Sequence, residues 1–122
     1  MANITIKAGD VTATAELNDS STARMILAAL PIEASGQTWG DEIYFEIPVS
    51  AEEDNAQAVV ELGDLGYWPP GSAFCSFYGK TPASPGDEIR PASPVNVVGR
   101  ITSDPLAFRG MRSGVKVTIT AD

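Results

Sequence analysis

Apolar and polar residues alternate with a period of two in five segments of this 122-residue chain. In one of these segments Ile43, Phe45 and Ile47 alternate with Tyr44 and Glu46. The other four segments are residues 3–7, 11–17, 73–78 and 115–120. Because successive side chains of a strand point to opposite faces, this period predicts strands that each turn one face to a core. Residues 59–62 and 95–101 are further strand candidates.

One segment has the period of a helix instead. Polar residues able to cap a helix occupy positions 18–21, and Pro31 follows the last apolar position. The apolar positions of this helix face are Ala23, Ile26, Leu27 and Leu30. We therefore predict a helix over about residues 20–30. Short strands with a single helix predict a mainly β fold: a closed antiparallel barrel with the helix over one end, in one domain of residues 1–122.

Residues 63–82 concentrate four glycines, three prolines and five of the nine aromatic residues of the chain. Glycine and proline restrict the paths that a backbone can follow, so the first part of this segment predicts a loop of fixed shape. The aromatic side chains would give that loop contact area. Residues 82–94, which hold four prolines, predict a second ordered loop rather than a linker between domains.

The composition excludes several kinds of chemistry. The chain has no histidine and one cysteine, Cys75, so it can form no internal disulfide, no ordinary zinc site and no imidazole base. We interpret Cys75 as a buried, unreactive thiol, and we expect neither a metal nor a cofactor. The net charge of −8 would repel nucleic acid. No apolar run approaches a membrane span and no signal sequence is visible, so we expect no membrane partner and a cytoplasmic location.

The charge is distributed unevenly along the chain. Residues 1–64 carry twelve acids and two bases, whereas residues 65–122 carry four acids and six bases. Complementary patches of this kind could join two copies of the chain. Alternatively, the two halves interleave in one barrel and neutralise each other locally. A monomer and a homodimer are both compatible with this pattern.

Three motifs, in order along the chain, carry a family resemblance: residues 39–48 (WGDEIYFEIP), 63–71 (GDLGYWPPG) and 94–99 (PVNVVG). Together they resemble the small prokaryotic cyclophilin-like family, over roughly residues 3 to 119. The resemblance implies a single closed barrel of uncharacterised function. Shorter matches resemble cyclophilins themselves: Thr22-Ala23 near the start of the helix, residues 71–74 (GSAF) and residues 97–101 (VVGRI).

The resemblance does not extend to the residues of prolyl isomerase activity. Cyclophilins place an arginine in a Phe-His-Arg-hydrophobic strand, and the corresponding strand here has Glu46 at the arginine position. The glutamine that follows Gly-Ser becomes Ala73, an aromatic becomes Cys75, and the pocket histidine falls near Val95. Replacing a cation by an anion reverses the charge offered to the twisted amide, so prolyl isomerase activity is not expected.

Six residues are candidates for a binding site in the groove that cyclophilins use. Tyr44 and Glu46 share a strand face, so Glu46 is either a ligand-binding acid or a solvated strand residue. Tyr67 and Trp68 lie beside two prolines and either wall the groove or anchor their loop. Phe74 adjoins the groove by the resemblance. Arg90 either binds a carboxylate or pairs with Glu46 or another acid. We interpret Trp39 as a core residue or a plug of the barrel end.

These observations favour a non-catalytic binding module that holds a small molecule or an extended peptide in the groove. Two alternatives stay open. One is an enzyme of unknown reaction that uses Glu46 as a general base. The other is a structural barrel that self-associates through its charge asymmetry.

Overall fold

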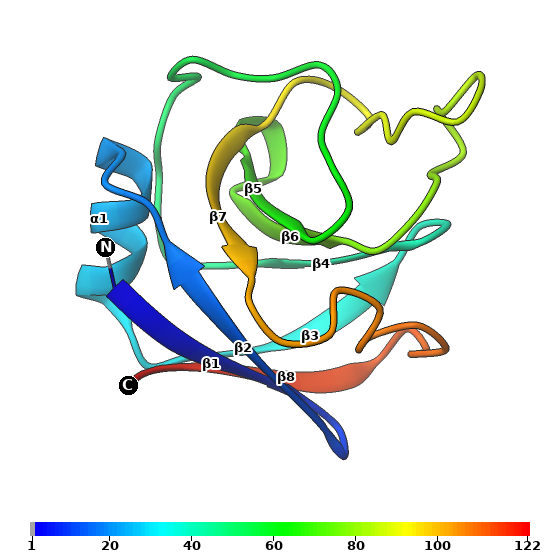
Figure 1. Ribbon diagram of the computed structural model, residues 1–122. Coiled ribbons are helices and arrows are strands. Elements are labelled where there is room, and N and C mark those ends of the chain that lie inside the picture. The colour runs from blue at the N-terminus through cyan, green and yellow to red at the C-terminus, as the bar shows by residue number, and fades with distance from the viewer. Residues whose placement is uncertain (1) are drawn as a thin grey trace.

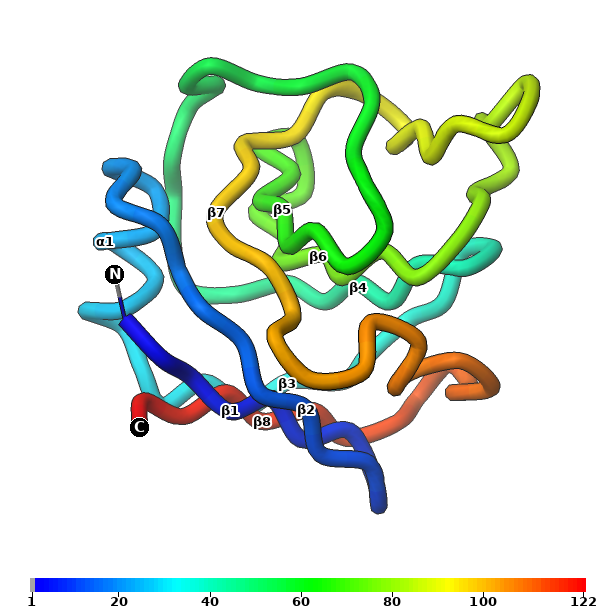
Figure 2. The backbone as a smooth tube through the Cα atoms, in the orientation of Figure 1, coloured from blue at the N-terminus to red at the C-terminus, as the bar shows by residue number. Residues whose placement is uncertain are grey.

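The computed structural model describes residues 2–122, which form a closed barrel of eight strands (Figure 1). All neighbouring strands are antiparallel, and their order around the barrel is β1-β2-β7-β5-β6-β4-β3-β8. The strands are β1 (Ala2–Ala8), β2 (Val11–Leu17), β3 (Ile32–Thr38), β4 (Glu42–Glu46), β5 (Asp64–Trp68), β6 (Ala73–Phe77), β7 (Asn96–Ile101) and β8 (Val115–Ala121). The predicted barrel is confirmed. Its first and last strands pair with each other, so the two ends of the chain lie side by side (Figure 2).

The helix α1 (Ser21–Ala29) lies between β2 and β3, within the range predicted from the sequence. Its N-cap is Ser20, whose Oγ accepts the Ala23 N–H at 3.2 Å. Asn18 supports the cap, because its side chain accepts a hydrogen bond from the Ser20 hydroxyl and donates one to the Val97 carbonyl of β7. Ala23 and Ile26 of the helix are buried in the barrel core. The helix thereby covers the end of the barrel at which β2 stops and β3 begins.

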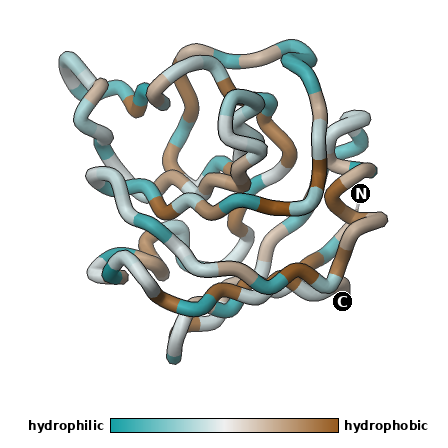
Figure 3. The backbone as a smooth tube through the Cα atoms, turned by 180° about the vertical axis from the view of Figure 1, so that it is seen from behind, coloured by the Kyte–Doolittle hydropathy of each residue, from teal (hydrophilic) through white to brown (hydrophobic). Residues whose placement is uncertain are grey.

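The barrel interior holds the alternate residues that the strand period singled out. Ile4 and Ile6 of β1, Phe45 of β4 and Ile119 of β8 are all buried there. Phe45 stacks on Phe74 with ring centroids 5.4 Å apart. In Figure 3 hydrophobic and hydrophilic residues alternate along the lower strands, as strands with one solvated face require.

Two segments differ from the prediction. Residues 64–68, expected to be part of a loop, form β5, which pairs with β6 through the 3₁₀ turn Pro69–Gly71. The prolines shape that turn rather than the whole segment. Residues 59–62, expected to be a strand, form only a single bridge between Val60 and Ile89. This segment has too few backbone partners to continue as a strand.

Strand β6 is buried on both of its faces. Phe74 points into the barrel, while Ala73, Cys75 and Phe77 point outward and are also buried. Outside the barrel these three side chains pack with Val60, Ile89 and Val95, which come from the long segments 47–63 and 78–95. We call this second group the outer cluster. It explains why the alternating pattern of β6 is apolar at both sets of positions.

Candidate functional site

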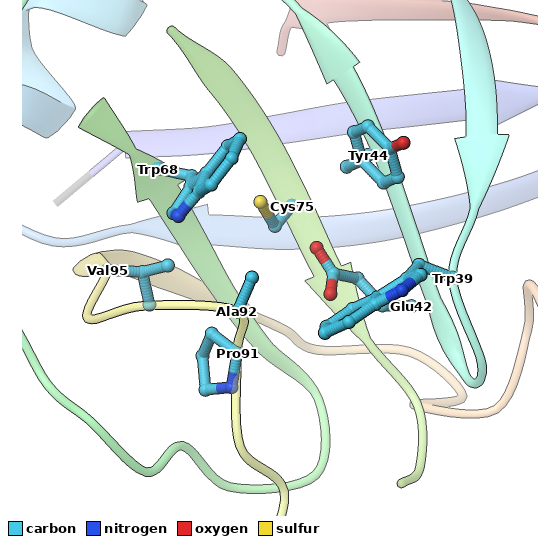
Figure 4. Close-up of a pocket in the computed structure, with 8 residues that line it drawn as sticks. All are labelled: Trp39, Glu42, Tyr44, Trp68, Cys75, Pro91, Ala92 and Val95. Atoms are coloured by element: carbon cyan, nitrogen blue, oxygen red, sulfur yellow. The ribbon is translucent and has the colours of Figure 1, made fainter. Parts of the chain in front are cut away.

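A pocket opens on the outer face of the barrel, where β4, β6 and β5 meet the segment that precedes β7. Its cavity has a volume of about 280 Å³. Eight residues line it: Trp39, Glu42, Tyr44, Trp68, Cys75, Pro91, Ala92 and Val95 (Figure 4). We call it the Glu42 pocket, because Glu42 is the one carboxylic acid among the lining residues, which include no lysine or arginine. Most of the remaining surface is aromatic or aliphatic.

The position of Glu42 follows from the turn that starts β4. Gly40 has a φ of +62°, which a residue with a side chain rarely adopts, and it reverses the chain between β3 and β4. The Trp39 N–H donates to the Glu42 carbonyl at 2.9 Å and closes this turn. Asp41 is bonded through its backbone to Lys80 and Tyr78. Glu42 is thereby held on the outer face of the barrel, opposite Phe77 of β6.

The Glu42 side chain is only 6% exposed, so its carboxylate has lost most of its hydration. This burial raises the pKa of Glu42 from 4.5 to about 7, and a hydrogen bond from the Cys75 thiol opposes the rise. The described residues 2–122 contain two side-chain ion pairs, Arg90–Glu88 and Lys116–Glu33, and Glu42 belongs to neither. A buried carboxyl therefore faces the pocket without a cationic partner among the described residues.

Cys75 lies under the pocket and is buried, as the sequence led us to expect. Burial raises the pKa of its thiol well above the ordinary value, and the neighbouring Glu42 charge raises it further. A thiol in this state is protonated at neutral pH and is a poor nucleophile. Its contribution to the pocket is its contact surface and the hydrogen bond to Glu42.

Aromatic side chains form the walls of the Glu42 pocket (Figure 4). The Trp68 indole packs on Gly71, where an added Cβ would lie 2.8 Å from the ring. Its Nε1–H donates to the Ser93 hydroxyl at 2.6 Å, so the ring is fixed at both ends. Tyr44 extends from β4 toward the same space, and Trp39 lies beside the Glu42 carboxylate. Trp39 is thus half-buried in a pocket, and the interpretation of it as a core or plug residue is wrong.

The opposite wall is formed by Pro91, Ala92 and Val95. The segment before them is fixed by Thr81, whose hydroxyl donates to the Arg90 carbonyl, and by Ser84, whose Oγ accepts the N–H groups of Thr81 and Arg90. Val95 exchanges two backbone hydrogen bonds with Gln57, at 2.8 and 3.1 Å. This wall is therefore an ordered structure, as predicted for residues 82–94.

The expected convergence of candidate residues on one surface holds for two of them. Tyr44 and Trp68 both line the Glu42 pocket. Glu46 lies on the same face of β4 but is exposed to solvent and is not a lining residue. Glu42 is buried and Glu46 is exposed, so the buried carboxyl of this strand lies four residues earlier than the one we considered.

Tyr67 and Phe74 lie on the other side of the barrel wall. Tyr67 has 0% exposure within the barrel core, and its hydroxyl donates to the Val49 carbonyl at 2.7 Å. It pairs in register with Phe74, which is also inside. The expectation that Tyr67 walls the groove with Trp68 is wrong, because neighbours on a strand point to opposite faces. Phe74 supports the site from behind without lining it.

Arg90 precedes the lining residue Pro91 but does not line the pocket itself. Its guanidinium bonds the Glu88 carboxylate at 2.7 Å, and both side chains are partly exposed. Of the alternatives for Arg90, the structure shows pairing with an acid, which is Glu88 rather than Glu46.

The sequence contained a signal for Glu42 that we did not use. Glu42 continues the outward series of Tyr44 and Glu46 by one step of two residues, but it precedes Ile43, the first residue of the alternating segment that we identified. Pro91, Ala92 and Val95 had no comparable signal, because their approach to β6 depends on how a distant loop folds back.

Residues 2–122 contain no group of three side chains able to hold a metal ion. The helix of this part of the chain is too short to cross a membrane.

The chain is similar to known proteins over nearly its whole length. The sequence model named "Cyclophilin-like" matches residues 2–120. A hypothetical protein from Archaeoglobus fulgidus, solved in solution, is 42% identical and has a TM-score of 0.83, with 99% of this chain and 95% of that chain covered. McbB, solved in complex with tryptophan, is 16% identical with a TM-score of 0.67, covering 96% of this chain and 44% of McbB. No curated protein sequence matches the chain.

Proposed function

Since the chain belongs to the cyclophilin-like family, we propose that it uses the outer face of its barrel as a binding module, with a small organic molecule in the Glu42 pocket. The observation that carries this proposal is the combination of an apolar, aromatic cavity with one buried carboxyl. Binding sites for small molecules are mostly apolar concavities with a few placed polar groups.

The dimensions of the pocket favour a small molecule over an extended peptide. Its volume of about 280 Å³ is close to the lower end of the range for ligand pockets, roughly 300–1,000 Å³. In Figure 4 Pro91 and Ala92 lie on one side of the cavity, and Trp39 and Glu42 lie on the other. The strands on both sides of β6 are already paired, so a peptide could not add to the sheet there.

The two tryptophans of the chain provide a direct test, because both line the pocket. A set of small aromatic and aliphatic compounds can be screened by intrinsic tryptophan fluorescence, which reports on Trp39 and Trp68 alone. We expect some compounds to change the emission in a saturable way. In the variant Ala92→Phe, a ring would fill the cavity and abolish the change. Ala58→Phe places the same ring on an exposed loop residue outside the pocket and should have no effect.

Saturable binding that Ala92→Phe leaves intact would place the ligand elsewhere and contradict the proposal. So would the absence of any saturable change across the set.

A second candidate function is general acid–base catalysis, with Glu42 in the role considered for Glu46. The observation that favours it is the pKa of Glu42, about 7, because a group that titrates near the working pH can both take and give a proton. Turnover of a bound compound that disappears in Glu42→Gln, with binding retained, would support catalysis. Binding without chemical change supports the binding module.

A further inference from the structure

The buried carboxyl of Glu42 restricts the charge of the ligand that the pocket can hold. Glu42 is 6% exposed, its carboxyl accepts a hydrogen bond from the Cys75 thiol, and no cationic side chain lines the cavity. A neutral thiol is a weak donor and cannot balance a full negative charge. An ionised carboxylate in such a place costs free energy unless a positive group lies against it.

The walls around Glu42 have the chemistry that attracts cations. The faces of tryptophan and tyrosine rings carry negative potential, and cations bind there at roughly 6 Å or less from the ring centre. Trp39, Tyr44 and Trp68 supply three such rings around one carboxyl. The net charge of the chain, −8, adds a long-range attraction for positive ligands.

We propose that the ligand of the Glu42 pocket is an organic cation: a protonated primary or secondary amine on a compact apolar body, with its nitrogen against the Glu42 carboxylate. This inference rests on the proposed function, because it names the class of molecule that the same pocket takes. The ammonium group donates hydrogen bonds to Glu42, and the apolar body packs against the tryptophan rings and Val95.

The same surroundings oppose anionic ligands. A carboxylate or phosphate would find no arginine or lysine among the lining residues and would lie against Glu42. Arg90, close by in sequence, is paired with Glu88. A neutral alcohol can accept or donate one hydrogen bond at Glu42 but leaves its charge unbalanced.

Binding of an amine should also depend on pH. The titratable groups near Glu42 are Tyr44 on its own strand, Cys75 of β6, and Tyr78, the residue after β6. The negative charges of Asp41 and Glu42 both raise the pKa of Tyr78. Burial raises the pKa of both Cys75 and Tyr78, so these groups keep their protons near neutral pH. With a Glu42 pKa of about 7, the ionised fraction rises about tenfold between pH 6 and pH 8, and amine affinity should rise about tenfold with it.

The test compares three probes of similar shape by titration calorimetry at pH 8: phenethylamine, 2-phenylethanol and 3-phenylpropionate. We expect phenethylamine to bind at least about tenfold more tightly than the other two. In Glu42→Gln this preference should vanish. Glu53→Gln removes the same charge from an exposed loop residue outside the pocket and should keep the preference. Phenethylamine titrations of the wild type at pH 6 and pH 8 give a second measurement that needs no variant.

Equal binding of the three probes, or phenethylamine affinity that does not change between pH 6 and pH 8, would overturn this inference and leave the binding module standing. If no probe binds while other compounds bind in the fluorescence screen, the inference fails alone. If nothing binds in either experiment, both proposals fail.

Discussion

Glu42 and Glu46 lie on one face of β4, four residues apart, in different surroundings. Glu42 is buried in the pocket beside Trp39, whereas Glu46 is open to solvent. Removing water from a carboxyl disfavours its charged form, so burial gives Glu42 its raised pKa. The chemistry of this strand face therefore depends on what covers each residue, and the residue types alone do not distinguish the two acids.

The raised pKa of Glu42 makes the stability of the fold depend on pH. The folded protein holds this proton more tightly than the unfolded chain does, so the stabilisation is complete below the unfolded pKa of 4.5 and is lost as pH rises to about 7. The difference between these two pKa values corresponds to a change of at most about 3 kcal/mol in the free energy of unfolding. Glutamine resembles the protonated side chain, so Glu42→Gln should match the wild type near pH 4.5 and exceed its stability by up to about 3 kcal/mol at pH 8.

Urea unfolding of both proteins at the two pH values measures this difference. Burial also raises the pKa of Asp64, so the comparison of variant with wild type is needed to isolate Glu42. If the stability difference between the two proteins is the same at both pH values, the raised pKa assigned to Glu42 is wrong.

At the scale of elements, the hairpin of β5 and β6 forms the floor of the pocket. Gly66 of β5 lies opposite Cys75 and faces outward, where an added Cβ would lie 2.9 Å from a Val95 methyl and 3.3 Å from the Phe77 ring. The absence of a side chain at Gly66 lets Val95 approach the sheet and complete the wall. The register of β5 on β7 also shifts between Leu65 and Gly66.

Gly66→Ala should therefore disturb both the outer cluster and the pocket. We expect a loss of about 1–3 kcal/mol in the free energy of unfolding, as for other overpacked cores, together with weaker ligand binding. Gly86→Ala is the matched control, because no atom lies within 4 Å of its added Cβ, and it should change stability by no more than about 0.5 kcal/mol. Equal effects of the two substitutions, measured by urea unfolding, would refute the role assigned to Gly66.

The same elements show how far the sequence predicts this structure. Period-two alternation located β4, and capping residues with a period of 3.6 located α1, because both signals are local. β5 was not predicted, since Gly63, Gly66 and Pro69 in one short run are typical of a loop, and pairing with β6 and β7 overrides that preference. Tyr44 and Trp68 were predicted for the site, but the burial of Glu42 depends on long-range contacts that no local pattern reports.

At the scale of the whole molecule, the barrel presents a site on its outer face, and the long segment before β7 gives that site its second wall. Figure 1 shows β4, β5 and β6 as neighbours in the wall, with this segment leaving β6 and returning to β7. The interior is filled by side chains of the main core, so the cavity available to a ligand lies outside the barrel.

The charge of the residues that line the pocket predicts whether the protein catalyses prolyl isomerisation. The lining residues include an acid and no base, so the pocket offers a twisted amide no cationic hydrogen-bond donor at the proline nitrogen. We expect micromolar protein to leave the cis–trans exchange rate of an Ala-Pro peptide at its uncatalysed value. Exchange spectroscopy by NMR measures this rate, with a cyclophilin as the positive control. Acceleration that Ala92→Phe abolishes would contradict this prediction and assign catalysis to the pocket.

The central claim is that the Glu42 pocket is the binding site of this protein, and the two indole N–H signals in an NMR spectrum test it most directly. Trp39 and Trp68 are the only tryptophans of the chain, and both line the cavity. Titration at pH 8 with phenethylamine and, separately, with 2-phenylethanol should move both indole signals along saturable curves for at least one probe, together with the Cys75 amide signal. Saturable shifts confined to another region such as α1 would contradict the claim. So would the absence of any shift with these two probes and with every compound of the fluorescence screen.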